Sequence, residues 1–184
     1  MRRTVPTRQV LRLHPDSLCV AATQIEVDVA RARAGGLLLS YAVTGRIGDL
    51  RLPPVAAAAS GDELWQHTCF EAFVRPLPGA AYYEFNLAPS TQWATYRFDS
   101  YRSGMRVAAE IGAPRIEAQT APERYTLQAA LGLSSLPREA LWRLGLAAVI
   151  EETNGNKSYW ALAHPPGKPD FHHCDGFALE LSSA

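Results

Sequence analysis

Apolar and polar residues alternate along most of the chain, which is the pattern of β-strands that bury one face. Helical spacing of apolar residues is scarce by comparison. Glycine, proline and asparagine interrupt the alternation at short intervals, so we expect many short strands joined by turns. The expected strands cover residues 8–13, 18–29, 37–44, 68–75, 81–87, 92–99, 115–119, 125–131, 143–151, 157–163 and 177–181.

Local turn signals add detail to this pattern. Ser60 and Glu63 have the spacing of a capping box, which predicts a single helical turn just before Trp65. A second helical turn is expected over residues 136–141. The run Thr153-Asn154-Gly155 predicts the tight turn of a β-hairpin, because Asn-Gly accepts the backbone angles that such turns require.

Many short strands without alternating helices are typical of all-β proteins. We therefore expect an antiparallel β-sandwich, or a barrel, with one or two short helical turns. No linker-like stretch divides the sequence, so residues 1–184 are expected to form a single domain.

Three neighbouring strands, expected over 68–75, 81–87 and 92–99, separate apolar from polar side chains, since residues i and i+2 share a face. One set is apolar and should face the core: Phe70, Ala72, Val74, Phe85, Leu87, Tyr96 and Phe98. The other set should lie together on the opposite face if the strands pair in order: Glu71, Glu84, Asn86, Trp93, Arg97 and Asp99.

The polar set has the chemistry of a recognition surface. Carboxylates and amides bind hydroxyl groups, and an indole ring stacks on a flat apolar ligand surface. The alternative is an ordinary solvated face, on which cross-strand Glu–Arg pairs contribute only ~0.2–1 kcal/mol. Trp160 adds a further aromatic ring; for each such ring, packing in the core is the competing interpretation.

Composition and charge narrow the classes of partner. The chain has 18 basic and 18 acidic residues, a balance that favours neither nucleic acid nor an anionic membrane. No apolar run approaches the ~20 residues of a membrane span, and no signal-peptide pattern follows Arg2 and Arg3. The three cysteines are widely spaced, which argues against a disulfide framework. We expect a cytoplasmic protein.

Several motifs resemble those of bacterial DOMON-like proteins, a group similar to the family nine carbohydrate-binding module. The motifs are LWQHTCFEAF (64–73), YEFN (83–86), PSTQW (89–93), YRF (96–98), YR (101–102), AVIE (148–151), SYWAL (158–162) and PDFH (169–172). The resemblance implies an antiparallel β-sandwich of jelly-roll type. The wider superfamily includes sugar-binding domains and haem-binding domains.

In the sugar-binding relatives, aromatic side chains hold the saccharide and polar residues bind its hydroxyl groups. By residue type, Trp93 and Trp160 are the candidates to stack on a ligand. The candidates to bind hydroxyl groups are Glu71, Glu84, Asn86 and Arg97. We therefore expect a non-catalytic domain that binds a carbohydrate or a similar polar small molecule.

Two cofactor chemistries compete with this interpretation. Haem in the related domains takes Met and His ligands, and Met105 is the one internal methionine, with His67, His164, His172 and His173 available. A metal site is suggested by the consecutive donors of residues 172–175, but neighbouring strand residues point to opposite faces, and the spacing matches no zinc signature.

Enzymatic alternatives remain open. His67, Cys69 and Glu71 alternate onto one face, but β-carbons of alternate strand residues are roughly 6–7 Å apart, too far for a direct nucleophile–base pair. A hydrolase would need two carboxylates about 5–10 Å apart, which Glu71 and Glu84, or Glu151, could supply. No glycine-rich phosphate loop is present.

Overall fold

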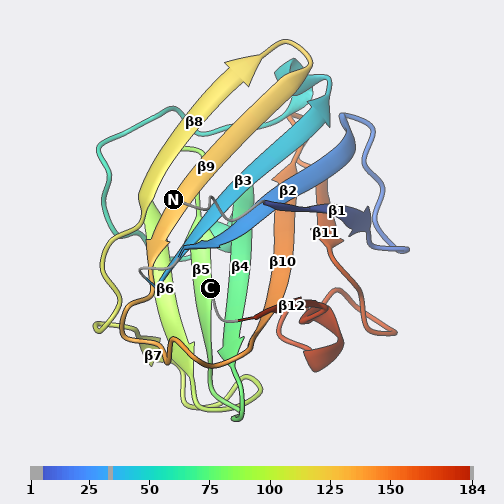
Figure 1. Ribbon diagram of the computed structural model, residues 1–184. Helices are drawn as coiled ribbons and strands as arrows, with labels where there is room; N and C mark the ends of the chain where they lie inside the picture. The colour runs from blue at the N-terminus through green and yellow to red at the C-terminus, as the bar shows by residue number, and fades with distance from the viewer. Residues whose placement is uncertain (1–5, 33–34, 183–184) are drawn as a thin grey trace.

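The computed structural model describes residues 6–32 and 35–182, and within them the chain folds into two layers of antiparallel strands (Figure 1). The front layer in Figure 1 contains β1 (Thr7–Leu13), β2 (Ala22–Ala32), β3 (Gly36–Gly45), β8 (Arg115–Ala121) and β9 (Arg124–Gly132). The rear layer contains β4 (Cys69–Pro76), β5 (Tyr82–Leu87), β6 (Trp93–Phe98), β7 (Arg106–Val107), β10 (Trp142–Glu151), β11 (Lys157–Ala161) and β12 (Leu179–Leu181).

Strand β1 joins the two layers. It pairs with β2 in the front layer and, at Arg12 and Leu13, with β11 in the rear layer. The two layers are therefore parts of one curled sheet, and the apolar sides of both strand sets enclose the core between them. The antiparallel β-sandwich expected from the alternation is confirmed.

The core is built from the inward positions of both layers. Tyr41 of β3, Phe70 of β4 and Tyr125 of β9 form one aromatic group, with ring centroids 5.1 Å (Tyr41–Phe70) and 5.8 Å (Phe70–Tyr125) apart. All three side chains are almost completely excluded from solvent. Burial of large aromatic side chains is the dominant stabilising contribution of such a core.

In the part of the chain that the structure describes, the helical content is limited to three 3₁₀ turns, η1 (Ile47–Asp49), η2 (Leu64–Gln66) and η3 (Cys174–Gly176). The turn expected beside Trp65 is present as η2, but the capping box is not: Glu63 has a left-handed φ of 53°, and no side chain caps the turn. The hairpin at Asn154 is also present, since β10 and β11 pair around it and Gly155 has a φ of 87°.

The prediction of a helical turn over residues 136–141 is wrong. That segment instead makes isolated turns, in which the Leu136 N–H donates to the Leu133 carbonyl and the Ala140 N–H to the Pro137 carbonyl. Leu136 and the following Trp142 are both buried, so the segment is held by the core rather than by helical hydrogen bonds.

The strand expected from residue 18 begins only at Ala22. The main-chain N–H groups of Val20 and Ala21 donate to Glu152 Oε1 at 3.0 and 2.7 Å. A side-chain acceptor from the β10–β11 hairpin therefore replaces the strand partner at these positions.

The register of β5 and β6 overturns one expectation from the sequence. Residues that oppose each other directly in antiparallel strands share a face, and Leu87 opposes Trp93 while Tyr83 opposes Arg97. Trp93 and Arg97 therefore lie on the inward side of the sheet, so the prediction that they share a face with Glu71, Glu84 and Asn86 is wrong. The paired positions are fixed by the 88–92 loop, and a one-residue difference in register reverses the faces of a strand.

Candidate functional site

The outward side of the rear layer carries a cleft of about 460 Å³. Strands β4, β5, β6, β10 and β11 form its floor, and η2 and two loops rise around it. The loops are residues 99–105, which follow β6, and residues 162–178, which follow β11. The lining side chains are Trp65, Glu71, Glu84, Phe98, Arg102, Met105, Val149, Tyr159, Pro169, Phe171 and His172.

Glu71 lies on the floor of the cleft and is only 4% exposed. Within the described residues, its carboxylate has no hydrogen-bond or ion-pair partner, although its main-chain carbonyl accepts a hydrogen bond from Tyr41. Burial raises the pKa of Glu71 well above its ordinary value, and the nearby charge of Glu84 raises it further, while Arg102 opposes the shift. A buried carboxyl group without a partner is costly, so this group is available to a ligand.

Glu84 lies beside Glu71 on the next strand. Glu71 opposes Asn86 and Glu84 opposes Phe73, so the two glutamates are diagonal neighbours, with β-carbons somewhat less than about 7–8 Å apart. Asn86 Nδ2 donates to Glu84 Oε1 at 2.7 Å. Burial raises the pKa of Glu84, although the bond from Asn86 and the charge of Arg102 oppose that shift.

His172 closes one side of the cleft in a neutral form. Its ring packs edge-on against Phe73 and Phe98, with centroids 5.2 and 5.0 Å apart, and burial lowers its pKa to about 4. The hydroxyl of Tyr82 accepts a hydrogen bond from the main-chain N–H of Arg102 and lies 2.8 Å from His172 Nδ1. This arrangement favours a hydrogen on Nε2, which lies 3.7 Å from Glu84 Oε2, too far for a direct hydrogen bond.

A hydrogen-bonded bridge fixes the two loops at the mouth of the cleft. Asp170 accepts hydrogen bonds from Arg102 Nη2 (2.7 Å), the Tyr101 hydroxyl (2.5 Å) and the His172 N–H (3.1 Å). Burial alone would raise the pKa of Asp170, but the bonds from Tyr101 and Arg102 lower it below its ordinary value. Asp170 is therefore an ionised anchor between residues 99–105 and 162–178.

The walls of the cleft are aromatic. Trp65 at the rim is 37% exposed, and the rings of Tyr159 and Phe171 lie 6.2 Å apart between centroids. Phe98 and the aliphatic side chains of Met105 and Val149 complete the apolar lining. A cleft with apolar walls and a few buried polar groups at its floor has the general composition of small-molecule sites.

The structure brings together only part of the predicted site. Glu71, Glu84 and Asn86 lie on one face, whereas Trp93 and Arg97 lie on the other side of the sheet. Trp160 belongs to the core, where it is 5% exposed and its Nε1 donates to Ser158 Oγ at 3.0 Å. Trp160 therefore does not line the cleft.

The site predicted from the sequence omitted residues that η2, β11 and the two loops contribute. Trp65, Arg102, Tyr159, Phe171 and His172 line the cleft. The signal that could have found them was present, since all five occur in motifs that carry the family resemblance. Tyr159 lies on β11, whereas the positions of the other residues depend on how η2 and the loops fold over the sheet.

The His67–Cys69–Glu71 arrangement does not form a nucleophilic site. His67 Nδ1 lies 2.8 Å from Glu151 Oε2, and Glu151 also pairs with Arg51. Burial raises the pKa of the Cys69 thiol well above its ordinary value, which keeps the sulfur protonated and unreactive. The enzymatic interpretation based on Cys69 therefore has no support in this geometry.

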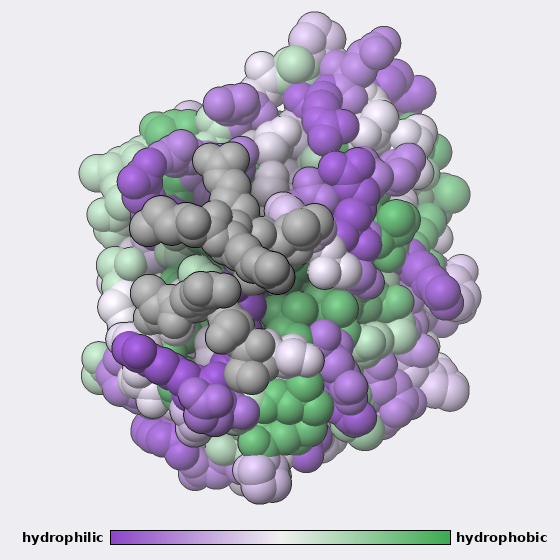
Figure 2. Space-filling view, viewed as in Figure 1, coloured by the Kyte–Doolittle hydropathy of each residue, from purple (hydrophilic) through white to green (hydrophobic). Residues whose placement is uncertain are grey.

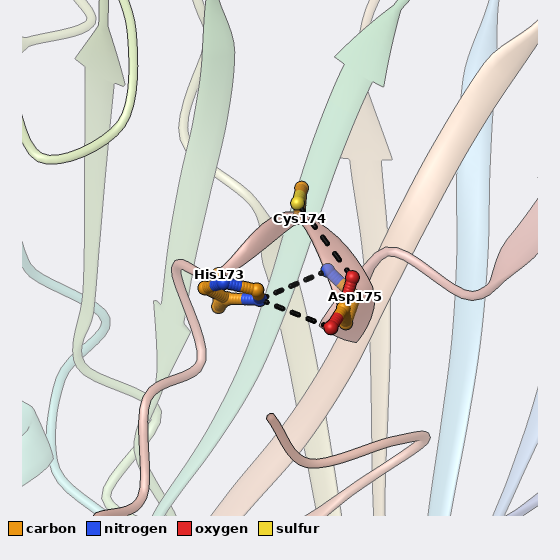
Figure 3. Close-up of side chains that lie close together, drawn as sticks. All are labelled: His173, Cys174 and Asp175. Carbon is orange, nitrogen blue, oxygen red and sulfur yellow. Dashed lines mark hydrogen bonds and ion pairs between the residues drawn. The ribbon is translucent and has the colours of Figure 1, made fainter. Parts of the chain in front are cut away.

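Potential metal donors gather at η3, where one ligand atom each from His173, Cys174 and Asp175 lie within 4.8 Å of one another (Figure 3). The closeness has a local explanation. His173 Nδ1 accepts a hydrogen bond from the Asp175 N–H and so caps the turn, and Cys174 Sγ lies 3.7 Å from Asp175 Oδ1. The three residues are neighbours in one turn, and their contacts within that turn account for the cluster.

A second hollow, of about 400 Å³, lies on the outward side of the front layer, over β2, β3, β8 and β9. Figure 2 shows this side of the molecule, where hydrophilic residues surround separate hydrophobic areas. The charged groups of the hollow are paired: Asp28 with Arg8, and Glu117 with Arg115. No buried polar group among its described lining residues is left for a ligand, so we assign the site to the cleft on the rear layer.

The cleft does not fit a haem. His172 and Met105 both line it, but the His172 ring is packed among Phe73, Tyr82 and Phe98, its Nδ1 is bonded to Tyr82, and its Nε2 faces Glu84. The floor also carries two buried acidic groups, which would meet the apolar face of the macrocycle.

Two solved structures have a similar fold. A protein from Bacteroides uniformis that is proposed to bind carbohydrate matches over 96% of this chain and 86% of its own, with a TM-score of 0.69 and 16% identity. A family 9 carbohydrate-binding module from Caldicellulosiruptor kristjanssonii, in complex with cellotriose, matches over 88% of this chain and 75% of its own, with a TM-score of 0.53 and 13% identity. This chain shares their fold.

At such low identities the likeness is one of fold alone. No family model matches the sequence, and no curated protein matches it. Membership of the DOMON-like group therefore stays a prediction. Within the described residues, no helix is long and apolar enough to cross a membrane.

Proposed function

We propose that the protein is a non-catalytic binding domain whose cleft over β4 and β5 takes a carbohydrate or a similar polar small molecule. The fold is shared with a module solved in complex with cellotriose, which supports a sugar as ligand. Ring-shaped polyols match the cleft chemically, because their C–H faces pack on aromatic rings while their hydroxyl groups need buried acceptors.

The burial of Glu71 without a hydrogen-bond partner is the single observation that carries the proposal. The Glu71 carboxyl group is 4% exposed, lacks a hydrogen-bond partner among the described residues and lines the cleft, so a partner can reach it only from the cleft side. A ligand hydroxyl reaching the floor would supply that bond. Glu84 and the Nε2–H of His172 lie close enough to bind further hydroxyl groups on the same ligand.

Ligand-induced change in tryptophan fluorescence tests this proposal. Trp65 stands at the rim, so a panel of mono- and oligosaccharides should alter its emission. The change should disappear in Trp65→Phe and persist in Trp93→Phe, because Trp93 lies on the inward side of the sheet. Saturable binding by calorimetry that survives both Trp65→Ala and Glu71→Ala would place the ligand elsewhere and contradict the proposal.

A glycosidase is the second candidate, because Glu71 and Glu84 are paired, buried and both raised in pKa. Such enzymes need one carboxyl group protonated and the other ionised, whereas burial acts in the same direction on both groups here. Release of nitrophenol from nitrophenyl glycosides by the wild-type protein, and not by Glu71→Gln or Glu84→Gln, would favour the enzyme over the binding domain.

A further inference from the structure

The polar groups of the cleft are dominated by acceptors. Glu71 and Glu84 both present carboxylate oxygens at the floor. The Arg102 guanidinium also lines the cleft, but it lies at the mouth, where its Nη2 is bonded to Asp170 and that carboxylate offsets its charge. His172 offers a single hydrogen on Nε2. The floor therefore suits a ligand that brings hydrogen-bond donors, and a positive charge with them.

We propose that the ligand is a saccharide with a protonated primary amine, held so that its ammonium group lies between the carboxylates of Glu71 and Glu84. This inference rests on the proposed function and specifies its ligand class. An ammonium group supplies three donors, enough to satisfy Glu71 and to reach the free oxygen of Glu84, Oε2.

The walls of the cleft favour the same charge. The faces of Trp, Tyr and Phe attract cations that approach within about 6 Å of the ring centroid, and Trp65, Tyr159, Phe98 and Phe171 surround the floor. Exclusion of water from such a site strengthens the attraction between an ammonium group and a carboxylate. A neutral hydroxyl group would gain less from both features.

Little positive charge near Glu71 and Glu84 would compete with an ammonium group. Arg102 is the cation that acts on both glutamates, and its charge is compensated by Asp170. His172 is neutral because burial lowers its pKa to about 4. Besides each other, the two glutamates have these titratable neighbours: Cys69 from β4, Tyr41 from β3, Tyr82 from β5, Tyr96 from β6, Tyr159 from β11, and Arg102 and His172 from the loops.

Binding of an amine should therefore be linked to proton release. Burial keeps the carboxyl groups protonated to a higher pH than usual when the cleft is empty. An ammonium group needs the ionised form, so each binding event should expel protons from the glutamates. Affinity should increase as the pH rises, until the amine itself loses its proton, whereas the affinity for a neutral sugar should not increase.

Isothermal titration calorimetry with matched sugars tests the inference. Glucosamine, N-acetylglucosamine and glucose, with the corresponding dimers, are titrated into the wild-type protein in two buffers of different ionisation enthalpy. We expect the amine to bind at least about tenfold more tightly than its acetylated form, as for a charge-assisted bond compared with a neutral one. Proton release should accompany only the amine.

Variants show whether the preference arises at the proposed place. Glu71→Gln should reduce the amine preference to about twofold or less, with Glu84→Gln as the second variant if the first fails to fold. Glu180→Gln is the matched control, because Glu180 is an exposed glutamate on β12 that pairs with Arg143. It should retain the full preference.

The outcomes separate this inference from the proposed function. Neutral sugars that bind in the cleft as tightly as the amine would overturn the inference and leave the proposed function intact. An amine preference that survives both glutamate variants would also overturn it. Failure of every sugar in the panel to bind would overturn both.

Discussion

The hydroxyl group of Tyr41 donates a 2.7 Å hydrogen bond to the main-chain carbonyl of Glu71. Tyr41 belongs to β3 in the front layer and Glu71 to β4 in the rear layer, so this bond crosses the core. The bond therefore tethers β4 from the core side of the sheet, while the Glu71 carboxylate faces the cleft on the opposite side. The position of the cleft floor therefore depends on the packing of the two layers against each other.

Removing this bond should destabilise the protein. Tyr41→Phe deletes one buried hydrogen bond, which should lower the free energy of unfolding by about 1–2 kcal/mol, measured by urea denaturation. Tyr125→Phe is the matched control, because Tyr125 also packs on Phe70 but its buried hydroxyl has no partner in the described residues. That variant should be neutral or slightly stabilising. Equal losses in both variants would contradict the assignment.

Glu71 should make the protein less stable as the pH rises. The pKa of Glu71 is raised in the folded state, so the unfolded chain releases its proton first and gains in relative stability. The loss begins above the ordinary pKa of 4.5 and is complete once the pH exceeds the folded pKa. Thermal unfolding of Glu71→Gln from about pH 4 to about pH 9 should show a higher melting temperature than wild type, with a difference that grows with pH. A constant difference across that range would rule out this account.

Glu152 should behave in the opposite way. Burial alone would raise its pKa, but hydrogen bonds from Asn156 and from the Ala21 and Val20 N–H groups lower it below the ordinary value. The ionised form therefore stabilises the fold, and that contribution is lost as the pH falls through the folded pKa. Glu152→Gln should cost about 1.5–3 kcal/mol near pH 7, measured by urea denaturation, and the gap to wild type should narrow under acidic conditions. A gap that widens on acidification would be the contrary result.

Asp170 should affect binding more than folding. Its carboxylate joins Tyr101 and Arg102 to the loop that carries His172, and it sits at the mouth rather than in the core. Asp170→Ala should weaken the binding of a saccharide that occupies the cleft by about tenfold, as expected for the loss of one charge-assisted contact, with a melting temperature close to that of wild type. Asp175→Ala, on the exposed η3 turn, is the control and should bind normally. Calorimetry of both variants checks the comparison, and an equal loss in Asp175→Ala would refute the role of the bridge.

The faces of β4 and β5 could be predicted from the sequence because each strand has one clearly apolar side. Phe70 and Ala72 face the core, and Glu71 and Glu84 face outward, as the alternation indicates. Strand β6 has aromatic residues on both sides, Trp93 on one and Tyr96 and Phe98 on the other. Its pattern alone does not specify which side is buried.

The cleft could be predicted only in part. Its two glutamates lie on regular strands, but Arg102 and Asp170 are joined by a hydrogen bond between residues 68 positions apart in the sequence. Nothing in the local pattern of either loop indicates that contact. The low pKa of His172 likewise arises from burial against residues of other segments.

The sequence by itself determined the class of fold, the positions of most strands and the outward face of Glu71 and Glu84, because strand periodicity is a local property of the chain. The tertiary structure decided the face of β6, the positions of Trp93, Arg97 and Trp160 away from the cleft, and the enclosure of the cleft by two loops. Register and loop packing depend on contacts between distant segments, and those contacts also set the burial that raises the pKa of Glu71.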